Sequence, residues 1–231
     1  MAKNSTSTLN LGKAEYETAA EGTGISASVY NLIMGGMVVY GLVVNIIMCM
    51  TCTRLAMSMN PVVLLIGYLV LVLAGTFMVH RSRSTALRFV GYNMIVIPLG
   101  LVLSVVVQSY GGLNSAIVMQ AFLYTGIITG AMVLLSIAFP SFFSRIGGML
   151  LGCLIGMLVA FIVVLLLHID TIVIAYFGAA LFSLYIGYDI WRSQQLPRTV
   201  GNAVLSACEI YVDIINLFLR LLEILGHNKN N

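Results

Sequence analysis

The sequence predicts an all-α membrane protein, a bundle of seven transmembrane helices, and two observations lead to this prediction. Hydrophobic residues make up 60% of the 231 residues and charged residues only 8%, whereas a soluble domain carries roughly 25% charged residues. The few charges are also unevenly spaced, so that long apolar stretches separate them. Such a chain cannot cover a globular surface with polar groups, which excludes a soluble enzyme, a disordered regulator and a nucleic-acid-binding protein.

Six stretches contain no Asp, Glu, Lys or Arg, and each is long enough to cross a bilayer as a helix, which takes about 17–25 residues. In chain order they are 29–50, 61–79, 89–107, 115–139, 146–167 and 171–188. A seventh apolar stretch, 203–225, contains four charged residues. We expect residues 29–226 to form one seven-helix membrane domain, between a polar N-terminal tail (1–28) and a short C-terminal tail (227–231).

The basic residues between the spans predict the orientation, because cytoplasmic loops of membrane proteins are enriched in Lys and Arg. A cytoplasmic N-terminus places eight basic residues inside, namely Lys3, Lys13, Arg81, Arg83, Arg88, Arg145, Arg192 and Arg198. The three that would lie outside are Arg54, Arg220 and Lys229. A re-entrant seventh stretch would instead bring the C-terminus inside. The acidic tail and the short loops favour a bacterial inner membrane, and an endomembrane location is the alternative.

Glycines recur at helical spacing in two of the spans, as Gly126 and Gly130 and as Gly148, Gly152 and Gly156. Small residues at this spacing let two helices approach closely. We expect these glycines to pack within the bundle rather than between two copies of the chain.

Five polar residues of the seventh stretch recur at i, i+4, i+7, i+11 and i+14, and therefore share one face of a helix. They are Glu209, Asp213, Asn216, Arg220 and Glu223. Since charged groups are costly in lipid, this face is expected to turn toward the bundle interior or a water-filled cavity. Arg220 and Glu223 are close enough in sequence to be partners.

Asp189, which directly follows the sixth stretch, is the other acid that the polar face of the seventh helix could contact. The short loop makes the sixth and seventh helices antiparallel neighbours, but helical rise places Asp189 and Asp213 about 9 Å apart in depth. Only a tilt or a slide of one helix would close that gap. Two carboxylates that met in an apolar interior would share one proton or attract Ca²⁺, which oxygen ligands suit. A pair that only joins two helices is the structural alternative.

The residues around these acids resemble a known signature. The run SLYIGYD at 183–189, followed by EIYVDIINLFLRLLEILG at 209–226, resembles the C-terminal signature of the transmembrane BAX inhibitor motif family. The run SRIGGML at 144–150 resembles, more weakly, the start of the family's fifth helix. The resemblance implies a bundle with the seventh helix in the centre and a pH-sensitive calcium leak. It maps the family's paired aspartates, the proposed pH sensor, onto Asp189 and Asp213.

The resemblance also implies a basic residue near the end of the second helix, and His80 and Arg81 both match it. Two features depart from the family: the second span has no carboxylate, which some members carry, and Glu209 stands where many members have a neutral residue. We therefore expect a calcium leak channel gated by Asp189 and Asp213, which also form its transient calcium site. The residues expected to support the sensor or the cation are Glu209, Asn216, His80 and Arg81.

In this interpretation the lipid bilayer, calcium and protons are the partners, and no cofactor is needed. The alternative is a non-conducting membrane regulator that binds a protease or channel partner in stress or cell-death control, which the resemblance also permits. The two differ in whether the purified protein alone conducts calcium.

We expect no enzymatic activity. Lysine occurs only at positions 3, 13 and 229, so no span holds the Schiff-base lysine of a retinal protein. An intramembrane aspartyl protease needs two carboxylates around one water, but its Gly-x-Gly-Asp motif is absent, as are His-Glu-x-x-His and Gly-x-Ser-x-Gly. Cys49 and Cys52 form a single CxxC pair, which is weak support for a metal or redox site.

Overall fold

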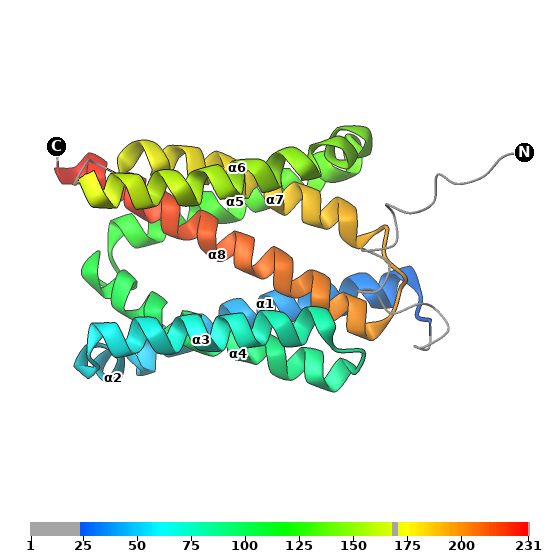
Figure 1. Ribbon diagram of the computed structural model, residues 1–231, viewed down its shortest axis with the longest axis horizontal. Helices are drawn as coiled ribbons and strands as arrows, with labels where there is room; N and C mark the ends of the chain where they lie inside the picture. The colour runs from blue at the N-terminus through cyan, green and yellow to red at the C-terminus, as the bar shows by residue number, and fades with distance from the viewer. Residues whose placement is uncertain (1–23, 168–170, 231) are drawn as a thin grey trace, which may run out of the picture.

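The computed structural model describes residues 24–167 and 171–230 of the chain, and the regular structure in these two ranges is entirely helical. The helices are α1 (Ala27–Thr51), α2 (Thr53–Ser58), α3 (Pro61–Arg81), α4 (Thr85–Ser109), α5 (Ala116–Ala138), α6 (Pro140–Leu167), α7 (Ile172–Ser193) and α8 (Val200–Asn230). The long helices run side by side and form one elongated bundle (Figure 1).

Six of the described helices, α1 and α3 to α7, are long and apolar enough to cross a membrane. They correspond, in chain order, to the six charge-free stretches, so the predicted all-helical membrane architecture is confirmed for these six stretches. The charged seventh stretch forms most of α8, which continues through 227–230. The short helix α2 was not predicted. Residues 1–23 of the predicted N-terminal tail, with Lys3 and Lys13, lie outside the described residues.

Local sequence signals explain where several helices begin and turn. The Ser26 hydroxyl accepts a hydrogen bond from the Val29 amide at 3.3 Å, and the Asn60 side chain accepts one from the Val62 amide at 2.9 Å. Such side chains satisfy amides that have no partner within the first helical turn. Between α4 and α5, Gly111 and Gly112 have positive φ angles of 94° and 80°, a conformation that favours glycine.

Helix α8 lies between two parts of the core. It contacts α1, α3, α4, α5 and α7, and it crosses the bundle at an incline in Figure 1. On one side its Phe218 belongs to an apolar cluster centred on α4, which includes Tyr92. On the other side its Leu217 belongs to a second cluster formed with α5, α6 and α7, which includes Ile186. Helix α8, which contains the charged seventh stretch, is therefore largely enclosed by other helices.

Helix α3 is the most peripheral of the six candidate spans. Only 11% of its most apolar window is buried, against 56% for α4. It packs mainly along α4, where Gly75 and Gly91 allow the two backbones to approach. A methyl group built on Gly75 would lie 2.6 Å from the carbonyl oxygen of Gly91. The position of α3 therefore depends chiefly on α4.

The expectation that the other glycines pack within the bundle is wrong. A methyl group added at Gly126, Gly130, Gly148, Gly152 or Gly156 would meet no atom of the described residues within 4 Å. All five glycines are exposed, and Gly126 and Gly156 border cavities between helices rather than close helix contacts. Their spacing predicts that they share a helix face, but it does not determine which way that face turns.

Candidate functional site

A cavity of about 570 Å³ lies beside α8 and gathers most of the polar side chains that the sequence singled out. Helices α3, α4, α6, α7 and α8 all contribute to it. The lining residues are Thr76, His80, Ile95, Gly147, Leu151, Tyr185, Tyr188, Asp189, Arg192, Cys208, Glu209, Val212 and Asp213. Three acids and two basic side chains therefore face one space between otherwise apolar helices.

Asp189 of α7 and Asp213 of α8 meet in this cavity. Their carboxyl groups are in hydrogen-bonding contact, and each residue is only 7% exposed. This contact means that the depth difference expected from the sequence is closed, and α8 runs at an incline across the bundle in Figure 1. Because two carboxylates offer only acceptors, a hydrogen bond between them requires a proton on one. The Oδ2 atom of Asp213 is buried, and no amide, hydroxyl or other donor of the described residues bonds to it.

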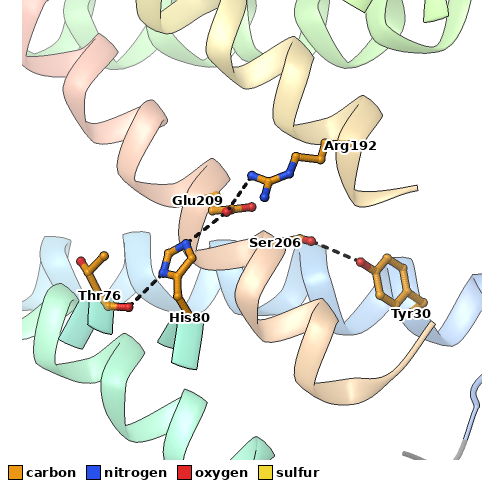
Figure 2. Close-up of polar contacts among 6 residues, drawn as sticks. All are labelled: Tyr30, Thr76, His80, Arg192, Ser206 and Glu209. Carbon is orange, nitrogen blue, oxygen red and sulfur yellow. Dashed lines mark hydrogen bonds and ion pairs between the residues drawn. The ribbon is translucent and has the colours of Figure 1, made fainter. Parts of the chain in front are cut away.

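Glu209 joins three helices at the same cavity. Its Oε1 atom accepts a hydrogen bond from Arg192 Nη1 of α7 at 3.0 Å and lies 3.3 Å from His80 Nε2 of α3. The other ring nitrogen of His80, Nδ1, lies 2.9 Å from the carbonyl oxygen of Thr76. Figure 2 shows the imidazole between these two oxygens. Glu209 and His80 therefore line the same cavity as Asp189 and Asp213, as expected. Their hydrogen-bonding contact, however, is with each other.

Two of the predicted support residues lie elsewhere. The Arg81 guanidinium sits 6.0 Å from the centre of the Phe77 ring on the exposed side of α3, so His80 rather than Arg81 reaches α8. Asn216 does not line the cavity, since its side-chain amide donates to the Val212 carbonyl oxygen of its own helix at 2.9 Å. The structure therefore brings together four of the six predicted site residues.

The far end of the polar face of α8 forms a separate cluster. As expected, Arg220 pairs with Glu223, with 2.9 Å between Nη1 and Oε2. Glu223 Oε1 also accepts a hydrogen bond from the Thr171 hydroxyl, just before α7, at 2.6 Å. Four of the five polar residues of α8 therefore divide between two sites, and Asn216 between them belongs to neither.

Sequence reasoning missed the role of Arg192, which it used only to predict the orientation. Arg192 follows Asp189 by three residues on the same helix, and residues at that spacing share a face. This spacing is the signal that could have placed Arg192 beside the acids.

Sequence reasoning also missed two anchors at the same end of the bundle. The Tyr30 hydroxyl of α1 donates to the Ser193 carbonyl oxygen at 3.0 Å and lies 3.2 Å from the Ser206 hydroxyl, the latter contact being drawn in Figure 2. Arg88 of α4 is 1% exposed and donates from Nε to the Ser82 carbonyl oxygen and from Nη1 to Asn202 Oδ1, at 2.9 and 2.8 Å. These contacts fix the start of α8 and with it one end of the cavity.

The fold and the site define an all-helical integral membrane protein in which buried acids and their partners line one cavity. Its sequence matches the family model described as Bax1-I, inhibitor of apoptosis-promoting Bax1, over residues 24–230. The chain belongs to this family, as the C-terminal signature indicated.

Curated relatives come from bacteria and from viruses. The inner membrane protein YbhL of Escherichia coli (strain K12) is 27% identical over 179 residues, which cover 72% of this chain and 74% of YbhL. The Golgi anti-apoptotic protein of Vaccinia virus (strain Lister) is 28% identical over 179 residues, which cover 75% of this chain and 73% of the viral protein. Both are similar to this chain over about three quarters of its length.

Proposed function

We propose that the protein is a pH-sensitive calcium leak channel in which Asp189 and Asp213 act together as pH sensor and gate. The observation that carries the proposal is the contact between these two buried carboxyl groups at the wall of a cavity. While they share a proton, the contact holds α7 and α8 together. Loss of the proton leaves two like charges in contact, which repel each other or attract a cation.

Several features support calcium as the permeant ion and α8 as the central, seventh membrane helix. Carboxylate oxygens are suitable calcium ligands, and Ca²⁺ accepts irregular ligand geometry. Helix α8 contacts five other helices, which supports a central place in a seven-helix bundle. A cytoplasmic N-terminus and an inner-membrane location, as in the YbhL relative, would put the cavity toward the cytoplasm. In this proposal calcium and protons are the only ligands, and the protein needs no cofactor and performs no catalysis.

The test is calcium flux in liposomes that contain only the purified protein and a calcium-sensitive dye. Wild-type protein is expected to give a flux that changes between pH 5 and pH 8. Asp189→Asn and Asp213→Asn are each expected to abolish that pH dependence, because an amide cannot lose the shared proton. Glu223→Gln is the matched control, since it removes a carboxylate of the same helix that does not line the cavity. Absence of flux at every pH would overturn the proposal.

A second candidate is a non-conducting regulator that binds another membrane protein, such as a protease or a channel. The similarity to the Golgi anti-apoptotic protein of Vaccinia virus favours it. This function predicts a stable partner that co-purifies from native membranes after cross-linking. Failure to capture any partner, together with flux from the purified protein, would exclude it.

A further inference from the structure

A second cavity lies against a different face of α8, between Ile46 of α1, Gly126 of α5 and Ile215 of α8. We call it the lateral cavity. Its volume is about 220 Å³, and it shares no lining residue with the cavity that contains Asp189 and Asp213. Helices α1 and α5 each pack along α8 but hardly touch each other, and Figure 1 shows α8 passing between them. The space between α1 and α5 is therefore left open.

The lateral cavity opens toward the lipid. Ile46 is 40% exposed and Gly126 is also exposed, and both lie within helices that are long and apolar enough to cross a membrane. On the opposite wall, Ile215 and Phe218 of α8 are only 4% and 2% exposed. The cavity thus has an apolar floor on α8 and a mouth between α1 and α5. A molecule dissolved in the bilayer can enter through this mouth without passing through water.

Two polar side chains in the lateral cavity have a buried oxygen without a hydrogen bond. They are Asn45 of α1, which is 1% exposed, and Thr129 of α5, and both line the cavity. No donor or acceptor of the described residues bonds to Asn45 Oδ1 or to Thr129 Oγ1. The Asn45 amide nitrogen is used, since it donates to the Tyr211 hydroxyl.

The Thr129 hydroxyl differs from that of its neighbour Thr125, which also lines the cavity. Thr125 donates to the Ala121 carbonyl oxygen of its own helix at 2.7 Å, as threonine side chains in helices commonly do. Thr129 makes no such bond. Because a buried polar group without a partner is costly, Asn45 and Thr129 favour an occupant that brings a polar group of its own.

We propose that the lateral cavity binds a small lipid-soluble alcohol or phenol, whose hydroxyl bonds to Asn45 or Thr129. A hydroxyl both donates and accepts, so it suits the Asn45 carbonyl oxygen, which only accepts, and the Thr129 hydroxyl. Size also limits the ligand: an apolar cavity of about 150 Å³ holds benzene, and the same ratio gives about nine non-hydrogen atoms here. The tail of a bilayer lipid fits less well, because it has no polar group for either oxygen.

The test compares two ligands of this size that differ in one group. They are 4-ethylphenol and 4-ethyltoluene, in which a methyl group replaces the hydroxyl. Binding to full-length protein in lipid nanodiscs is measured by equilibrium dialysis, protein-free nanodiscs of the same lipid give the partitioning to subtract, and the ligands are compared at equal mole fraction in the lipid. Wild-type protein is expected to bind 4-ethylphenol saturably and about three- to tenfold more tightly than 4-ethyltoluene, the value of one hydrogen bond.

A first pair of variants locates the site. Gly126→Phe places a ring at the mouth, because side chains on a helix lean toward the preceding turn, where Phe122 also lines the cavity. It is expected to weaken binding of both ligands about tenfold or more, the value of a fully buried apolar side chain. Gly148→Phe is the matched control, since Gly148 of α6 is equally open but does not line this cavity, and it should bind as the wild type does.

A second set of variants identifies the polar groups. Thr129→Val keeps the shape of the side chain, and Asn45→Leu keeps its approximate size. At least one of the two is expected to lose the preference for 4-ethylphenol while still binding 4-ethyltoluene. Thr125→Val is the matched control, because the Thr125 hydroxyl is already bonded within its helix. Circular dichroism checks folding, and if Asn45→Leu does not fold, Thr129→Val and Gly126→Phe still test the proposal.

Three results would overturn the proposal. The first is no saturable binding beyond that of protein-free nanodiscs. The second is unchanged binding to Gly126→Phe, which would place the ligands elsewhere. The third is equal affinity for the two ligands, which would mean that the cavity accepts any hydrocarbon, a lipid tail included. The measurement requires no calcium flux, so the proposal stands or falls independently of the channel function.

Discussion

Replacing Asn202 with alanine is expected to lower the free energy of unfolding by about 3 kcal/mol, because it removes one hydrogen-bond acceptor of the buried Arg88 side chain. Arg88 is 1% exposed and Asn202 is 0% exposed. The hydrogen bond from Arg88 to Asn202 involves a charged donor and is worth about 1.5–3 kcal/mol. The bond from Asn202 Nδ2 to the Pro197 carbonyl oxygen adds about 1 kcal/mol. The sum corresponds to roughly a hundredfold change in the unfolding equilibrium.

The assay is reversible unfolding in mixed detergent micelles, followed by circular dichroism as the fraction of sodium dodecyl sulfate rises. Arg88→Met, Asn202→Ala and the double variant complete a double-mutant cycle, with an expected coupling energy of about 1.5 kcal/mol or more. Asn93→Ala is the control on the same helix, because Asn93 accepts an exposed bond from the Tyr40 hydroxyl, and it should cost about 1 kcal/mol or less. A coupling energy near zero would refute this account of the Arg88 anchor.

Three further outcomes are expected in the same unfolding assay. Gly75→Leu should lower the free energy of unfolding by about 1–3 kcal/mol, because the larger side chain is overpacked against α4. Gly67→Leu is the control on an open face of α3, and it should be neutral or stabilising by up to about 1 kcal/mol. Equal effects of the two substitutions would contradict the close approach of α3 and α4. Thr171→Val removes the bond to Glu223 and should cost about 1 kcal/mol, with faster hydrogen exchange at the start of α7 but not of α8. Tyr30→Phe should cost about 1 kcal/mol, and an unchanged midpoint would argue against this anchor.

The membrane helices could be predicted because the bilayer imposes a length and excludes charge, and both requirements are visible in the sequence. The meeting of Asp189 and Asp213 could only be conjectured, since it depends on the tilt of α8, which packing against five helices determines. The same holds for His80 and Arg81: they are neighbours in sequence, and the rotation of α3 decides which one reaches Glu209. Helical spacing identified the polar face of α8 but not its division into two sites, because Asn216 bonds to its own backbone.

The cavity ends at Asp213, and the second polar cluster of α8 is centred on Glu223. Ten residues separate them, which is about 15 Å of helix at 1.5 Å per residue. Along that distance Leu217 and Leu222 are fully buried, and moving a bare ion past such side chains costs at least several kcal/mol. Under the proposed function, an ion that enters the cavity therefore still has to pass this apolar segment before it crosses the membrane. Under the proposed function, the number of ions that cross each second is set by how often the helices separate, and not by how many ions wait beside Asp213.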